Sequence, residues 1–456
     1  FSEGTVSGFG SVYVNGIRFA TDRADIVVDG TPAAEDALRV GMVLNVAGDV
    51  ASDGLSGSAR RVEFDRPLYG PVDAYDATAR RLVILGQPVQ LDDATVFSGV
   101  TEDTLQEGLL CMVSGYPSPG ELLATLLECR DDYAAGLTRV EVEGVVSGLD
   151  TGAGRFHLGA LEVAVGAATI DTAQGALADG ALVEVLGTQA QRGDVLQAER
   201  IRIKGASLKT GQAVLLEGVI GRFASLQDFE LNRRRVSAGT AQREDRHALA
   251  PASGVRMRLA GSVRADGVIE ATRYALQPPT DILLTGRVDE VDAARERLRL
   301  FGAERQALVV TQYEDRRATG ERAFRLEDLQ PGDYVQLRGF RDAQGQAVVT
   351  RIERRDEEPP EGGTIVVRLR IQIGTVDPAA ARTRGPLDGF SLVDNRLVIA
   401  GVAVQTDNAR TEFFDRNGAS VTGVQFYNGL RAGDRLEAVG NEASDVIQAT
   451  RVRYVR

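Results

Sequence analysis

The sequence predicts an all-β protein in which six small barrels follow one another like beads on a string. Three observations lead to this prediction. A hairpin pattern that contains a glycine occurs six times, and an opening strand with an internal glycine precedes each copy. The segments between them alternate apolar and polar residues with the period of a β-strand. One short polar segment per repeat has the character of a helical turn, so we expect little helix.

The hairpin pattern is clearest at residues 329–339, with a returning strand at 344–352. A turn that carries a glycine leads into an alternating strand, and that strand ends at a second glycine. The returning strand ends in a small residue, an arginine and an aliphatic residue, as at 449–452. The turn glycines that define the repeats are Gly41, Gly108, Gly180, Gly254, Gly332 and Gly433.

A second glycine recurs inside each opening strand. These positions are assigned to Gly4, Gly70, Gly144, Gly218, Gly286 and Gly374. The spacing to the turn glycine is 36 to 38 residues in the first four copies, but 46 and 59 residues in the last two, which therefore carry insertions. Glycine inside a strand is costly unless the strand bends, and bent strands allow a small sheet to close.

Each repeat therefore contains three strands, a helical turn such as 101–106 or 324–329, and the closing hairpin. In the returning strand, the alanine and the later apolar residue are three positions apart and cannot share one face of a regular strand. We therefore expect a β-bulge near the arginine. Five short strands with a helical turn between the third and fourth are typical of an OB-like barrel.

The repeats set the domain boundaries. We expect repeats at 1–66, 67–134, 135–206, 207–278, 279–356 and 357–456, the last with insertions. A charged segment rich in proline and glycine opens the sixth repeat, and its composition predicts a hinge. The hinge residues are Glu357, Glu358, Pro359, Pro360, Gly362 and Gly363.

The longest strand signal in the chain follows this hinge. It consists of Thr364, Ile365, Val366, Val367, Arg368, Leu369, Arg370, Ile371, Gln372 and Ile373. The first repeat has only three residues before Gly4, so its barrel is expected to lack half a strand. The sequence therefore suggests that 364–373 adds to the first barrel of another copy. A head-to-tail contact of this kind builds a filament unless it closes into a ring.

Composition restricts the class of protein. The chain has 456 residues, a net charge of −13 and 43% hydrophobic residues, as expected for a folded acidic protein. No apolar run is long enough for a membrane span. The acidic balance disfavours nucleic-acid binding, which depends on neutralising phosphates. Lysine occurs only at Lys204 and Lys209, so arginine supplies the other basic residues, and it can pair with the many carboxylates.

Common catalytic patterns are absent from the sequence. His157 and His247 lie in separate repeats, and there is no phosphate-binding loop or Gly-x-Ser-x-Gly elbow. We therefore expect no enzyme activity, no catalytic residue, no metal and no cofactor. Two alternatives stay open: calcium at the acidic loops 92–93 or 131–132, which lack EF-hand spacing, and a hydrolase that uses a pair of carboxylates.

The two cysteines lie in the second repeat. Cys111 falls in the fourth strand and Cys129 at the end of the fifth, roughly opposite each other across the turn at 117–120. In an exported protein this arrangement favours a cross-strand disulfide. Two buried free thiols are the alternative.

Residues 4–16, the closing hairpin pattern and residues 266–273 together resemble a known bacterial domain of unknown function. This domain occurs as tandem OB-like repeats in secreted proteins and lipoproteins. The resemblance covers nearly the whole chain and implies a secreted or cell-surface location. It brings no established activity and no catalytic residues.

Two functions are compatible with these features. The first is a non-catalytic extracytoplasmic structural protein that acts through contacts with itself or with other envelope proteins. The alternative is an envelope protein that binds a polysaccharide or a small ligand. For the alternative, the insertions of the sixth repeat at 413–418 and 426–428 are the best place for a binding groove, because they carry aromatic residues.

Overall fold

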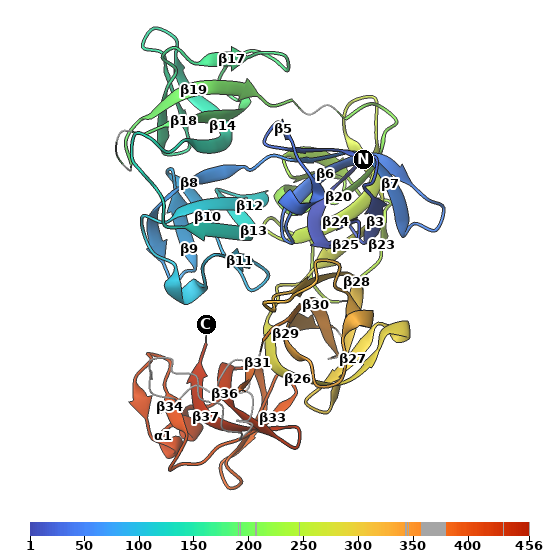
Figure 1. The fold of residues 1–456 in the computed structure, drawn as a ribbon, viewed down its shortest axis with the longest axis vertical. Helices are drawn as coiled ribbons and strands as arrows, with labels where there is room; N and C mark the ends of the chain where they lie inside the picture. Colours follow the sequence, from blue (N-terminus) through green and yellow to red (C-terminus); the bar gives the residue numbers. More distant parts are fainter. Residues whose placement is uncertain are drawn as a thin grey trace. The chain divides into compact units, whose positions relative to one another are not determined.

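The computed structural model describes residues 1–456 except 190, 192, 206–207, 246, 343, 345, 357–379, 432 and 456. Strands dominate it and form three sheets of 13, 12 and 12 strands (Figure 1). The chain divides into two compact units. The first is formed by residues 1–7 and 11–278, and the second by residues 8–10 and 279–456.

The 13-stranded sheet belongs to the first unit. Strands β1, β2, β3, β7 and β6 form a closed ring, and β20, β21, β22, β25 and β24 form a second ring in the same order. The elements are β1 (Ser2–Gly8), β2 (Val12–Val14), β3 (Ile17–Ala20), β4 (Asp25–Val28), β5 (Thr31–Pro32), η1 (Glu35–Ala37), β6 (Val43–Val50), β7 (Ser56–Phe64), β20 (Ala213–Ser225), β21 (Asp228–Leu231), β22 (Arg234–Ser237), β23 (Gln242–Arg243), β24 (Arg256–Val263) and β25 (Ile269–Gln277).

The second sheet completes the first unit with the same ring order. Its rings are β8, β9, β10, β13, β12 and β14, β15, β16, β19, β18. The elements are β8 (Leu68–Asp76), β9 (Arg81–Ile84), β10 (Gln87–Gln90), β11 (Val96–Ser98), η2 (Glu102–Thr104), β12 (Leu110–Ser118), β13 (Glu121–Arg130), β14 (Val140–Asp150), β15 (Arg155–Leu158), β16 (Leu161–Ala164), β17 (Thr169–Asp171), β18 (Leu182–Thr188) and β19 (Leu196–Ile203).

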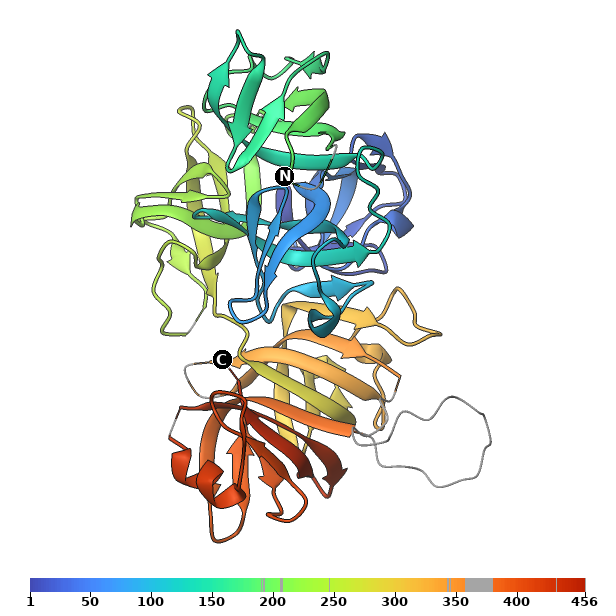
Figure 2. The ribbon, with the colours of Figure 1, turned by 90° about the vertical axis from the view of Figure 1, so that its left-hand side faces the viewer.

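The third sheet lies in the second unit, where its strands curl into rings (Figure 2). Its rings are β26, β27, β28, β30, β29 and β31, β32, β33, β37, β36. The elements are β26 (Ile282–Asp292), η3 (Ala293–Arg295), β27 (Arg297–Leu300), β28 (Ala303–Asp315), η4 (Leu326–Asp328), β29 (Tyr334–Arg341), β30 (Ala347–Arg354), β31 (Ala380–Ser391), β32 (Arg396–Ile399), β33 (Val402–Gln405), β34 (Glu412–Phe414), β35 (Ser420–Val421), α1 (Gly423–Gly429), β36 (Arg435–Ala443) and β37 (Val446–Tyr454).

The turn glycines share one backbone conformation. All six have φ between 84° and 93°, the left-handed region in which a side chain is strained. Each lies just before the fourth strand of its ring, where the chain enters the closing hairpin. Their recurrence therefore reflects backbone geometry. A catalytic or binding role is not needed to explain it.

The opening glycines make room for a neighbouring turn. A Cβ atom at Gly218 would lie 2.1 Å from the side chain of Asn232, and one at Gly70 would lie 2.5 Å from Leu85. Asn232 and Leu85 occupy the turn between the second and third strands of their repeats, both with positive φ. The glycine therefore lets this turn pack across the opening strand, in addition to any bend it permits.

The bulge expected near the arginine is present in the closing hairpins. In the fourth repeat, Ala260 pairs with Arg273 and Gly261 pairs with Ala271, so Thr272 is the extra residue. The same shift occurs at Gly440, which pairs with Ala449. A Cβ atom at Gly261 would lie 2.2 Å from a backbone oxygen of the returning strand, which explains the second glycine of the hairpin pattern.

The opening strand of the last repeat was assigned wrongly from spacing. Gly374 lies outside the described residues, and the opening position is occupied by Gly385 in β31, which pairs with Leu436 of the closing hairpin. A Cβ atom there would lie 2.8 Å from Ala400 in the adjoining turn. The hinge 357–363 and the strand 364–373 also lie outside the described residues.

The barrels are not separate beads, because their opening strands pair with one another. β8 pairs with β14 at Tyr69–Glu141, and β26 pairs with β31 at Leu284–Thr383, both antiparallel. β1 pairs with β20 in parallel, at Ser2–Leu215 and Glu3–Leu216. The edge at the start of the first repeat, expected to be open to another copy, therefore contacts the fourth repeat of the same chain.

Apolar burial accompanies this pairing. One hydrophobic cluster contains Leu68 of β8 and Val142 of β14, and another contains Leu284 of β26 and Ala381 of β31. Each cluster runs through both rings of its sheet. Burying apolar surface between rings stabilises the pair, so a short backbone ladder is sufficient to join them.

Within the described part of the chain, no helix combines the length and the apolar character that crossing a membrane requires.

Candidate functional site

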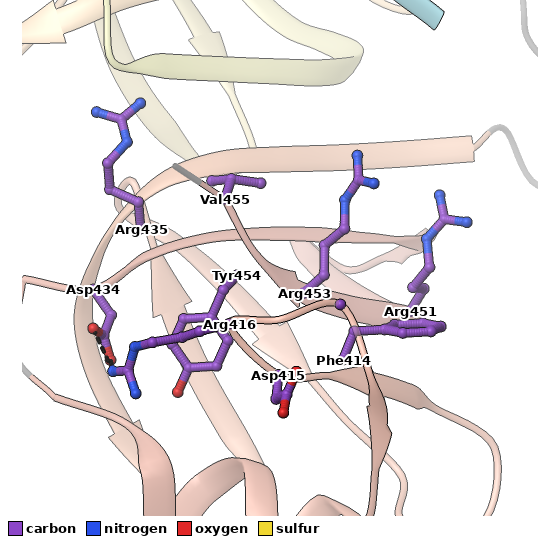
Figure 3. Close-up of a pocket in the computed structure, with 10 residues that line it drawn as sticks. Phe414, Asp415, Arg416, Asp434, Arg435, Arg451, Arg453, Tyr454 and Val455 are labelled. Carbon is purple, nitrogen blue, oxygen red and sulfur yellow. Dashed lines mark hydrogen bonds and ion pairs between the residues drawn. The ribbon is translucent and has the colours of Figure 1, made fainter. Parts of the chain in front are cut away.

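A pocket of about 580 Å³ lies in the last repeat, beside the final strand. Its wall is formed by Phe414, Asp415, Arg416, Gly418, Asp434, Arg435, Arg451, Arg453, Tyr454 and Val455. Figure 3 shows these residues on three segments: the end of β34 with the turn that follows it, the start of β36, and the end of β37. The pocket therefore combines repeat-defining strands with the insertion of this repeat.

The insertion forms a tight turn that carries one of the arginines. The Asp415 carboxylate accepts the backbone N–H groups of Asn417, at 2.8 Å, and Ala419, at 2.9 Å. Gly418 has φ 78°, which suits glycine at this point of the turn. The carboxylate of Asp415 is thus engaged in holding the turn that presents Arg416.

Arg416 lies over the ring of Tyr454 and forms an ion pair with Asp434. Its guanidinium carbon is 4.5 Å from the centre of the Tyr454 ring, and its nitrogen donates to Asp434 at 2.8 and 2.9 Å (Figure 3). The hydrogen bonds to Asp434 raise the pKa of Arg416. The Tyr454 ring also packs against Phe426, with ring centres 5.2 Å apart. This side of the pocket is therefore a packed wall.

The remaining arginines point to one side of the pocket. Arg451 and Arg453 are two residues apart on β37, so they share a face of the strand. In Figure 3 their guanidinium groups extend in the same direction as that of Arg435. Arg453 is held by Glu437, whose carboxylate is buried and lies 2.6 Å away. Arg435 donates to the backbone oxygen of Asp281 at 3.2 Å.

The lining has the chemistry of an anion-binding site. Four arginines face two aspartates, and both aspartates are engaged, one by the turn amides and the other by Arg416. The lining contains no histidine, cysteine or lysine. Arginine stays protonated and donates several hydrogen bonds from a rigid plane, so it binds and orients anions well but does not transfer protons.

A comparison with protein families identifies the repeats. The model of the Domain of unknown function (DUF5666) matches residues 3–63, 69–128, 143–202, 285–353 and 384–453. These matches cover more than half of the chain. The chain belongs to this family. No curated protein and no solved structure matched the chain.

The five DUF5666 matches correspond to rings of strands in the structure. The segment from β20 to β25 lies between the third and fourth matches and has the same ring order. The pocket lies in the last match, at its C-terminal end. Because this family has no assigned function, the match supplies no role for the arginines.

Three carboxylates form a second cluster in the second unit. Oxygen atoms of Asp289, Glu442 and Asp445 all lie within 4.8 Å of one another and could hold a cation. The equivalent place in the paired repeat holds a balanced ion pair: there Asp388 binds Arg341 at 2.8 Å. Counted from the repeat glycines, Asp289 matches Asp388 and Glu442 matches Arg341. The sequence did not indicate this cluster, because its members come from two repeats.

Burial raises the pKa of Glu442 to about 7, and the neighbouring charge of Asp289 adds to the effect. Folding therefore favours the protonated form of Glu442. The stability that this form contributes is lost as the pH rises from the ordinary pKa of a glutamate towards 7. The variant Glu442→Gln is expected to be more stable than the parent at pH 8, by on the order of 1 kcal/mol after solvent screening, and equally stable at pH 4. Thermal unfolding at the two pH values measures this difference.

Glu412→Gln is the matched control, because Glu412 is exposed in the same repeat. It should change stability little at either pH. An equal gain in both variants at pH 8 would assign the effect to net charge and contradict the role given to Glu442.

The cysteines predicted to pair are joined. Cys111 and Cys129 form a disulfide between β12 and β13, with Cα atoms 4.2 Å apart and directly opposite in register. Both side chains are buried in the core of the second repeat.

His247 and the acidic loop 92–93, both considered from the sequence, have structural contacts. His247 lies 3.3 Å from Asp245 and contacts the backbone oxygen of Leu276, so it holds a loop. In the acidic loop 92–93, Asp92 pairs with Arg256 at 2.9 Å and Asp93 with an arginine of its own repeat. These carboxylates are therefore matched by arginine charges and do not converge on an empty centre.

The pocket lies in the repeat for which the sequence suggests a binding groove. Of the aromatic residues at 413–418 and 426–428, however, Phe413, Phe426 and Tyr427 are buried in the core, and Phe414 lines the pocket. The informative signal was the pair Arg451 and Arg453 in the closing strand. The first of these belongs to the repeat pattern, so it was interpreted as a feature of the fold.

Proposed function

We propose that the chain is a non-catalytic structural protein made of six OB-like barrels, acting outside the cytoplasm through protein–protein contacts. Its partners are other copies of itself or other proteins of the cell envelope. The proposal rests on the family match, on the ring of five strands that recurs along the chain, and on the way in which these rings associate.

The supporting observation is the pairing of opening strands. It occurs in all three sheets, twice antiparallel and once in parallel, through two or three residue pairs each time. A domain that repeatedly binds its own kind by strand pairing has a surface suited to β-augmentation. We therefore keep the proposal that residues 364–373 pair with a sheet edge of another copy and so build a filament.

The test compares the full chain with a variant in which 364–373 are replaced by a Gly/Ser segment of equal length. The full chain is expected to form larger particles as its concentration rises, measured by light scattering and electron microscopy. The variant should remain a single chain. Replacing only 357–363 in the same way is the control, and it should leave assembly intact.

Two results would contradict the assembly proposal. One is a full chain that stays monomeric at every concentration tested. The other is a 364–373 variant that assembles as well as the parent, which would exclude this segment as the connecting strand.

A second function is favoured by the pocket in the last repeat. Its volume lies in the range of small-molecule sites, about 300–1,000 Å³, and it has a preformed polar lining. Under this proposal the paired barrels are a frame and the last repeat binds a ligand, either a small molecule or part of a polysaccharide. Binding to the full chain, measured by calorimetry, tests it.

A further inference from the structure

We propose that the pocket of the last repeat binds a ligand with at least two negatively charged groups, phosphate or carboxylate. This inference rests on the second proposed function, that the pocket binds a ligand, and adds the chemical class of that ligand. It names the pocket residues Arg435, Arg451 and Arg453 as the groups that contact the anion.

The local charge is opposite to that of the whole chain. The protein has a net charge of −13, yet this pocket is lined by four arginines and two aspartates. Charges of one sign in a concave site focus the electric field and raise the local concentration of the opposite ion. In a protein that repels anions overall, this concentration of arginines selects for an anion at one place.

The pocket charges are held in position before any ligand arrives. Glu437 fixes Arg453 through an ion pair of 2.6 Å and is itself only 4% exposed. Arg416 is fixed by Asp434 and the ring of Tyr454. A ligand therefore does not have to order these side chains, and less binding energy is lost to conformational entropy.

The engaged aspartates do not oppose the anion strongly. Asp415 is committed to the amides of its turn, and Asp434 is neutralised by Arg416. In Figure 3 the guanidinium groups of Arg435, Arg451 and Arg453 extend in one direction, away from Asp415. An anion that approaches from that direction reaches guanidinium donors before the Asp415 carboxylate.

The spacing of the arginines favours more than one acidic group. Arg451 and Arg453 are two residues apart on one strand face, which places their Cα atoms about 7 Å apart. Two acidic groups on one ligand can each receive a charge-assisted, bidentate hydrogen bond from one guanidinium. A neutral sugar offers no charge to these guanidinium groups, so it is expected to bind more weakly.

The experiment uses isothermal titration calorimetry with the full chain and three probes. Pyrophosphate tests phosphate chemistry, digalacturonate tests carboxylates on a sugar, and maltose is the neutral control. At least one acidic probe is expected to bind at about 1 mM or tighter, and maltose is not. The stronger acidic probe identifies whether the source of the charge is phosphate or uronic acid.

The variant Arg451→Gln/Arg453→Gln is expected to weaken binding of the acidic probe at least about tenfold, because it removes two charged hydrogen-bond donors. Arg410→Gln is the matched control. Arg410 belongs to the same repeat, lies outside the pocket and has a side chain that is 87% exposed. It removes the same charge and should leave binding unchanged.

Arg453 contacts a buried carboxylate, so the double variant is checked by circular dichroism. If the double variant does not fold, two other measurements take its place: binding to the variant Arg451→Lys, and the salt dependence of binding to the parent. The lysine keeps the charge but loses the bidentate geometry and should weaken binding. Raising the salt from about 50 to about 500 mM should weaken binding as well, because screening shortens the reach of the pocket charges.

The outcomes distinguish the proposal that the pocket binds a ligand from the proposal that this ligand is an anion. Binding of maltose without binding of either acidic probe would keep ligand binding but overturn the anion proposal. No binding of any probe would overturn both. Equal weakening by Arg410→Gln, or binding that salt does not change, would also overturn the anion site, since the attraction would then not depend on these arginines.

Discussion

Replacing Glu353 with alanine is expected to lower the free energy of unfolding by about 3–5 kcal/mol, because it removes the buried counter-charge of Arg351 and leaves that arginine only the partly exposed Glu314. The Glu353 carboxylate is 3% exposed and lies 2.5 Å from Arg351, which is itself 2% exposed. Arg355 donates to the same carboxylate at 2.8 Å, and Arg316 lies 3.9 Å away. Unfolding in urea, followed by circular dichroism, measures the loss.

The pH dependence of this variant provides an independent check. Burial acts to raise the pKa of Glu353, but Arg351, Arg316 and Arg355 outweigh it and hold the pKa well below the ordinary value. A lowered pKa in the folded state gives stability that is present above the ordinary pKa and is lost as the pH falls below it. The parent should therefore lose more stability than Glu353→Ala between pH 6 and pH 3.

Glu290→Ala is the control, because Glu290 belongs to the same repeat and its side chain is 63% exposed beside Arg299. Removing a surface ion pair of this kind changes stability by about 1 kcal/mol or less. Similar losses in the two variants would show that the buried arginines find other partners and would contradict the expectation.

Reducing the disulfide between Cys111 and Cys129 is expected to destabilise the protein by about 3 kcal/mol, since the bond closes a loop of moderate length in the unfolded chain. The two residues are 18 positions apart, and both are buried between β12 and β13. The measurement is thermal unfolding with and without reductant, with alkylation used to count free thiols.

The variant Cys111→Ala/Cys129→Ala separates the bond from the reductant. It should unfold at a lower temperature than the oxidised parent and should not respond to reductant. If the parent unfolds at the same temperature in both states, and alkylation shows two free thiols in the reduced sample, the bond does not stabilise the fold.

The elements that the sequence predicts well are those with local causes. A turn that needs positive φ selects glycine, so Gly41 and its equivalents identify the hairpins. Two residues that face each other across a short hairpin can be found by counting, as Cys111 and Cys129 were. The bulge follows from the pattern of alternation within a single strand.

The elements that the sequence predicts poorly depend on residues that are far apart in the chain. Spacing alone placed the last opening glycine at Gly374, because an insertion changes the count without changing the pattern, and the structure has Gly385 there. Nothing in the pattern indicates that Ser2 pairs with Leu215, since each strand alone looks like any other opening strand. The pocket likewise depends on which side chains a fold brings together from β34, β36 and β37.

The pairing of the first repeat with the fourth affects synthesis on the ribosome. The ring that contains β1 can close early, but the partner of Ser2 lies more than 200 residues later in the chain. At about 5–20 residues per second, β20 emerges on the order of 10–40 s after β1. During this interval the second and third repeats can pair, but the edge of β1 does not yet have β20 as its partner. Chaperone binding or misassembly should therefore concentrate on nascent chains in which β20 has not yet been synthesised, because the edge of β1 is then still uncovered.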